Sequence, residues 1–169
     1  MNFPTTMIEN LRPIAPAVRQ RRGVAAYLCL LGVQTVGAAL ALMHGVPIYR
    51  QLTGDFTNYQ RQPGILWWAA AAVLLIQSAY WLRARLQPAL PSGGHMVLGT
   101  VAFFVARLNF VFASSTFAVV FLVRYEQLNP TLPRILLVLL LLFSLFCYTL
   151  ELERLAKALQ TTGSETKNL

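Results

Sequence analysis

The sequence predicts an all-α integral membrane protein, a bundle of four transmembrane helices with both termini in the cytoplasm. The chain of 169 residues is 56% hydrophobic and only 12% charged, with a mean hydropathy of +0.55. A soluble domain usually has about a quarter of its residues charged. The charges lie in short blocks, and the apolar runs between them approach the roughly 20 residues that a helix needs to cross a bilayer.

Residues 1–23 form a basic segment, expected in the cytoplasm, in which Pro4, Pro13 and Pro16 argue against a long helix. The first span is predicted at about residues 24–43. It is longer than a signal-peptide core and lacks a small-residue cleavage pattern, so we expect an uncleaved helix. A seam of mostly small residues at alternating spacings of four and three predicts its packing face. The seam consists of Ala25, Cys29, Gly32, Val36, Ala39 and Met43.

A polar loop is expected from His44 to Gly64, followed by the second span at about residues 65–82. Trp67 and Trp68 at its start are typical of an aromatic belt at the membrane surface. The second span repeats the small-residue seam at Ile65, Ala69, Ala72, Ile76 and Ala79. A connector rich in proline and glycine follows, which ends the helix.

The third span is predicted at residues 96–123, roughly 42 Å if fully helical. That exceeds the ~30 Å hydrocarbon core, so the helix must tilt or protrude. The fourth span, about residues 133–152, is leucine-rich, and we expect much of its surface to face lipid. Residues 153–169 form the predicted cytoplasmic tail. Residues 24–152 thus make up the transmembrane domain.

The net charge of +8 sets the predicted orientation. With both termini on one side, that side has nine basic residues and the other has four, which places the termini in the cytoplasm. The nine are Arg12, Arg19, Arg21, Arg22, Arg83, Arg85, Arg154, Lys157 and Lys167, and the four are Arg50, Arg61, Arg124 and Arg134. Because these residues lie at the ends of apolar runs and not along one face, nucleic acid is not an expected partner.

Arg107 is the one formal charge inside a predicted span. A central arginine costs at least ~2.5 kcal/mol on insertion scales, so we expect something to compensate for it. It could reach the inner interface or pair with Glu151, which shares a helical stripe with Ser144 and Tyr148. It could meet a carboxylate or phosphate from a partner subunit or a lipid. It could also lie in a water-filled path for an anionic substrate.

The third span has two nearly opposite stripes of polar or small residues. One contains Thr100, Arg107, Ser114 and Ala118, and the other contains Ala102, Ala106, Asn109, Ala113 and Thr116. One such stripe suffices to pack against one neighbour. Two stripes therefore predict that residues 96–123 form the central helix of the bundle.

The candidate site is an intramembrane polar cluster with either a structural role or a contact to a partner or substrate. Its members are Arg107, Asn109, Gln34, Gln77, Ser114, Ser144, Tyr148 and Glu151. Hydrogen bonding between helices is the simpler interpretation, because several of these residues fall at similar predicted depths.

No catalytic, cofactor or metal site is predicted. Paired intramembrane carboxylates, a Ser/His dyad and CxxC motifs are absent from the sequence, and Cys29 and Cys147 lie in apolar runs. His44 and His95 are expected at opposite membrane surfaces, so they cannot both ligate one haem.

These patterns lead us to expect a non-enzymatic accessory or scaffold subunit of a larger membrane complex. Its expected partners are membrane lipids and other membrane subunits or further copies of itself. The alternative is a small oligomeric transporter or channel for an anionic or polar solute, with Arg107 recognising it. An enzyme acting on lipids has the least support. Short loops and the absence of a glycosylation sequon, since Asn129 precedes proline, favour a bacterial inner membrane.

Overall fold

Four long helices account for most of the chain. The computed structural model describes residues 14–54, 64–91, 96–128 and 131–165. The long helices are α2 (Ile14–Thr53), α3 (Ile65–Leu86), α4 (Met96–Phe117) and α6 (Leu132–Glu165). A π-helix, η2 (Ala118–Val123), and a single turn, α5 (Tyr125–Leu128), follow α4. The described residues include no strand, which confirms the predicted all-α class with four helices long and apolar enough to cross a membrane.

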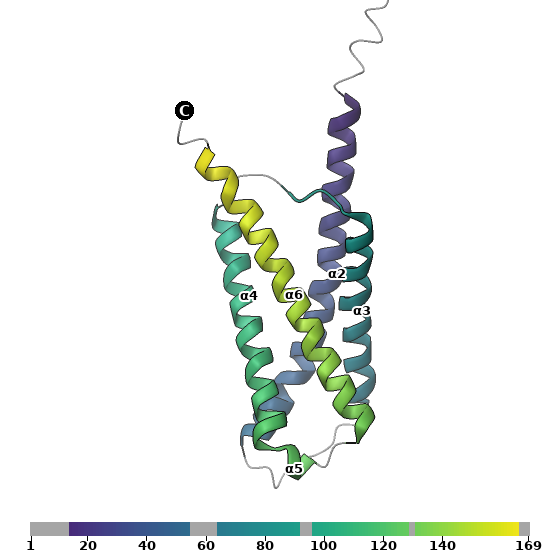
Figure 1. Ribbon diagram of the computed structural model, residues 1–169, viewed down its shortest axis with the longest axis vertical. Coiled ribbons are helices and arrows are strands. Elements are labelled where there is room, and N and C mark those ends of the chain that lie inside the picture. The colour runs from purple at the N-terminus through teal and green to yellow at the C-terminus, as the bar shows by residue number, and fades with distance from the viewer. Residues whose placement is uncertain (1–13, 55–63, 92–95, 129–130, 166–169) are drawn as a thin grey trace, which may run out of the picture.

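The helices form two pairs, α2 with α3 and α4 with α6, and α6 joins the pairs by also packing on α3. Figure 1 shows α6 running diagonally across the bundle, from α4 at one end to α3 at the other. The start of α2 and the end of α6 lie at the same end of the bundle (Figure 1). This end also holds the end of α3 and the start of α4.

The central helix is α6, so the prediction that residues 96–123 form the centre is wrong. Of the four apolar helices, α6 has the largest buried share, 39%. One face of α6, with Ser144 and Glu151, contacts α3 and α2. Another face, with Leu145 and Thr149, contacts α4. The two-sided packing expected of the third span therefore belongs to the fourth.

Helix α2 is much longer than the predicted first span. It begins at Ile14 and continues to Thr53, so the helix extends into both the predicted basic segment and the predicted loop from His44. Pro16 lies in its first turn, where a helix needs no backbone N–H from that residue. Pro47 lies inside the helix, where it removes one backbone hydrogen bond.

The predicted small-residue packing face is confirmed for α3 and wrong for α2. On α3, Ala72, Ile76 and Ala79 are buried as predicted. On α2, the predicted seam faces outward, and Val36 and Met43 are 57% and 72% exposed. The packing face of α2 instead contains Tyr27, Gln34, Gly37, Ala38 and Ala41.

The π-helix η2 changes the end of the third apolar helix. The backbone N–H of Arg124 donates to the carbonyl of Val119 at 2.9 Å, five residues earlier. The side chain of Arg124 reaches the end of α2, where Nε donates to the carbonyl of Leu52 at 3.0 Å. A cation at a helix C-terminus satisfies carbonyls that have no intrahelical partner and favours the helix dipole. Arg124 therefore fastens the end of α2 to η2.

Candidate functional site

A buried carboxylate, Glu151 of α6, is the centre of a cluster of charged and polar side chains. The side chain is 1% exposed. Its Oε1 accepts a hydrogen bond of 2.9 Å from the hydroxyl of Tyr27 on α2. Its Oε2 forms an ion pair with Nη2 of Arg83, at the last turn of α3. Three helices therefore meet at one carboxylate.

Arg83 is nearly as buried as its partner, with 8% of the residue exposed. Its guanidinium carbon lies 5.4 Å from the centre of the Tyr27 ring, which is a cation–π contact. The second cation is Arg154, one turn beyond Glu151 on α6, whose Nη1 lies 4.0 Å from Oε2. The side chain of Arg154 is 63% exposed. The buried Arg83 therefore neutralises Glu151 within the bundle, and the more exposed Arg154 lies on the outer side of the carboxylate.

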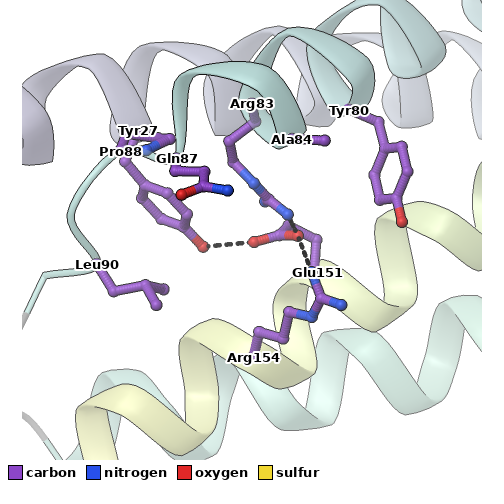
Figure 2. A pocket seen from close by; sticks show the side chains of 9 residues that line it. All are labelled: Tyr27, Tyr80, Arg83, Ala84, Gln87, Pro88, Leu90, Glu151 and Arg154. Carbon is purple, nitrogen blue, oxygen red and sulfur yellow. Dashed lines mark hydrogen bonds and ion pairs between the residues drawn. The ribbon is translucent and has the colours of Figure 1, made fainter.

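These side chains line a pocket of about 260 Å³. Figure 2 shows Glu151 between the guanidinium groups of Arg83 and Arg154, with Tyr27 on the other side of the carboxylate. Tyr80 and Gln87 add a hydroxyl and an amide, and Pro88 and Leu90 add an apolar edge (Figure 2). Gln87 has a left-handed backbone, φ 42°, and its N–H donates to the carbonyl of Arg83, which ends α3 at the pocket.

Sequence reasoning included Glu151 in the cluster but missed Arg83. The predicted second span ends at Leu82, which leaves Arg83 only the role of a determinant of orientation. The signal was nevertheless present. Ile65, Ala69, Ala72, Ile76 and Ala79 alternate in steps of four and three, and the next step of four reaches Arg83. The seam that packs α3 into the bundle therefore also positions its arginine.

Arg107 does not pair with Glu151, which corrects the internal pairing considered from the sequence. Glu151 faces α2 and α3, whereas Arg107 lies on the outer side of α4 with its side chain 57% exposed. Its Nη2 lies 3.7 Å from Oε1 of Glu153, and its guanidinium stacks 4.8 Å from the centre of the Phe103 ring. Ser114, on the same predicted stripe, is also exposed. This stripe of α4 has an outward position.

Apart from Gln34, the remaining predicted residues lie on or contact one stretch of α6, residues 144–149. Gln77 donates to the hydroxyl of Ser144 at 3.0 Å. The amide nitrogen of Asn109 donates to the Leu145 carbonyl and to the Thr149 hydroxyl, both at 2.8 Å. The Tyr148 hydroxyl lies 3.1 Å from the Thr35 hydroxyl. The Gln34 amide is 1% exposed and has no hydrogen-bond partner among the described residues.

The two free cysteines and the histidine in the described residues do not add a chemical centre. Within those residues no group of three or more metal-ligating side chains occurs. Cys29 is exposed and Cys147 is buried. His44 stacks on Trp68 at 5.1 Å and its Nδ1 lies 3.0 Å from the Leu40 carbonyl. It lines a second, mainly apolar cavity of about 800 Å³ near the opposite end of the bundle. His95 lies outside the described residues.

No protein-family model, curated protein or solved structure gives a significant match to this chain. The function is therefore argued from the side chains alone. Oε1 of Glu151 accepts a hydrogen bond and Oε2 is in an ion pair, so the cluster is suited to holding opposite charges together.

Proposed function

We propose that the chain is a non-enzymatic accessory or scaffold subunit of a larger membrane protein complex, in a bacterial inner membrane. The observation that carries this proposal is the outward position of Arg107 on α4. Its neighbours on that side are the exposed side chains of Phe104, Leu108 and Val111. An apolar helix face with one arginine in it is suited to contact another membrane protein.

The contacts of Arg107 within the chain are weak. The distance of 3.7 Å to Glu153 exceeds that of a hydrogen bond, and the Glu153 side chain is itself 23% exposed. An exposed ion pair of this kind contributes about 0–1 kcal/mol. A carboxylate from a partner helix at hydrogen-bond distance would be a stronger partner for Arg107.

A second outward face supports the same proposal. The small-residue seam of α2 is exposed, and a Cβ added at Gly32 would meet no atom within 4 Å. Small residues let helix backbones approach closely in lipid, where packing drives association. The chain thus has one small-residue face on α2 and one basic face on α4 for neighbouring helices.

The test is co-purification from native membranes in a mild detergent, with three single variants. We expect wild-type chain to migrate with partner subunits, and Gly32→Leu and Arg107→Gln each to reduce that association. Gly32→Leu meets no neighbour within the chain and Arg107→Gln removes only exposed contacts, so thermal stability should be retained. Ser78→Leu is the matched control, because Ser78 is exposed on α3, away from both faces. A monodisperse wild-type monomer without partners would contradict the proposal.

The alternative is a small oligomeric transporter or channel for an anionic or polar solute. The observation that favours it is again the exposure of Arg107, since copies of the chain could place this residue along a shared path. Flux of anions into proteoliposomes should then depend on Arg107. Arg107→Lys keeps the charge but loses the planar fork that binds an anion through two nitrogens. Equal flux in wild type and Arg107→Gln would exclude this alternative.

A further inference from the structure

The pocket beside Glu151 has an excess of positive charge. Arg83 and Arg154 bring two positive charges, and Glu151 brings one negative charge, so the three groups carry +1 in total. The C-terminal end of α3 opposes this with roughly half a negative charge from its dipole. The cluster therefore stays positive and is suited to an anion.

Both arginines also keep hydrogen-bonding capacity. The Nη1 of Arg83 is buried and has no acceptor among the described residues, although Arg83 lines the pocket. The contact of Arg154 with Glu151 at 4.0 Å is too long for a hydrogen bond. An unsatisfied buried donor costs about 1–3 kcal/mol, more when it is charged. A ligand with several acceptor oxygens would engage the guanidinium groups of Arg83 and Arg154 at the same time.

We propose that this pocket binds a phosphate group. Phosphate presents several strong acceptors, and guanidinium groups bind it through parallel N–H bonds. The volume of about 260 Å³ exceeds a single phosphate, and Pro88 and Leu90 form an apolar edge beside the arginines. A polar pocket with an apolar edge fits the headgroup and glycerol of a phospholipid, and its polar part equally accepts free phosphate.

The depth of the pocket agrees with a headgroup. It lies where α3 ends, next to Arg85 and the turn at Gln87. In the predicted orientation this is the cytoplasmic surface, where anionic lipids attract basic residues. The Tyr27 ring packs under the Arg83 guanidinium, so the arginine is held in place before the ligand binds. Such preorganisation reduces the entropy lost on binding.

The test uses the full chain in a phosphate-free maltoside detergent. Three probes are titrated: inorganic phosphate, dihexanoyl phosphatidylglycerol, and dihexanoyl glycerol, which lacks the phosphate. Binding is followed by the melting temperature and by native mass spectrometry. We expect the phosphatidylglycerol to raise the melting temperature and to form a stoichiometric adduct, and dihexanoyl glycerol to do neither. Stabilisation by inorganic phosphate as well would identify a site for free phosphate, whereas stabilisation by the lipid alone would identify a headgroup site.

Variants locate the binding in the pocket. Arg154→Gln should weaken the affinity by about tenfold or more, as expected for the loss of one charge-assisted hydrogen bond. Arg85→Gln is the matched control, because Arg85 is exposed on α3 two residues from Arg83 and does not line the pocket. Arg83→Lys keeps the charge opposite Glu151 but replaces the forked guanidinium by a single ammonium group. This variant should fold and should bind phosphate less tightly. Wild-type affinity in Arg154→Gln, or equal stabilisation by the phosphate-free lipid, would overturn the proposal.

Discussion

Arg83 and Glu151 form an ion pair between the last turn of α3 and the middle of α6, with side chains only 9% and 1% exposed. Either residue without the other would destabilise the fold, because a buried charge without a partner loses its hydration with no compensation. Tyr27 closes the pair from α2 with a hydrogen bond of 2.9 Å to the carboxylate. Three of the four long helices thus depend on one contact.

Removing one member of this pair should destabilise the protein strongly. We expect Glu151→Gln and Arg83→Gln each to lower the free energy of unfolding by about 3–5 kcal/mol, as for other broken buried pairs. The double variant Arg83→Met with Glu151→Leu should recover most of that loss, since no buried charge remains. Thermal unfolding in detergent measures all three.

The control for this series is Glu153→Gln. Its pairing with Arg107 at 3.7 Å is partly exposed, and exposed pairs contribute about 0–1 kcal/mol. If Glu153→Gln destabilised as much as Glu151→Gln, the burial of the Arg83 pair would not be the source of its effect.

Two glycines of α2 should respond to alanine in opposite directions. A Cβ at Gly37 would lie 2.8 Å from Ile76 Cγ1 and 3.1 Å from the Ala72 carbonyl, so α2 and α3 would have to separate. Overpacking of this kind costs about 1–3 kcal/mol. Gly32 faces open space, where alanine should stabilise the helix by about 0.5–1 kcal/mol. Melting temperatures of the two variants test this, and a loss of stability in Gly32→Ala would contradict the outward position of that face.

Asn109 should contribute to the pairing of α4 with α6. Asn109→Ala removes two hydrogen bonds of 2.8 Å, and we expect a loss of about 1–2 kcal/mol, given measured values for single bonds between membrane helices. Ser114→Ala, on the exposed side of the same helix, should change stability by no more than about 0.5 kcal/mol. Equal effects of the two variants would contradict the packing face assigned to α4.

Arg124 should stabilise the last turn of α2. Arg124→Gln removes donation to the carbonyls of Leu52 and Gly54, at 3.0 and 3.4 Å. We expect faster amide hydrogen exchange at the end of α2, near Gly54, with little change in the α3–α6 contact. Arg134→Gln, at the start of α6, is the control and should leave this exchange unchanged. An unchanged rate in Arg124→Gln would show that α2 ends stably without the arginine.

The sequence predicts the number of apolar helices well because their length and hydropathy are local properties. It predicts the packing face of α3 because Ala69, Ala72, Ile76 and Ala79 recur at helical spacing, which is also a local property. Helix α2 has small residues on several sides, so their spacing did not distinguish the packing face from the outward face. The extension of α2 beyond Met43 was missed because Pro47 and the polar residues near it suggested a loop.

The centre of the bundle could not be read from composition. The leucine-rich α6 shows little contrast between its sides, so its sequence does not indicate how many neighbours it has. The shared stripe of Ser144, Tyr148 and Glu151 was correctly identified, but the neighbour was wrong: it is the α2–α3 pair and not α4. Helix order around a bundle is a non-local property, and it decides which arginine Glu151 meets.

The pairing of helices has a consequence for the order of assembly. During synthesis α2 and α3 emerge first, and they can pack through Gly37 and Ile76 before the rest of the chain exists. At that stage Arg83 has no carboxylate partner, so we expect its guanidinium to stay hydrated. Only the arrival of Glu151 on α6 allows it to be buried. The ion pair can therefore form only after the last helix has docked.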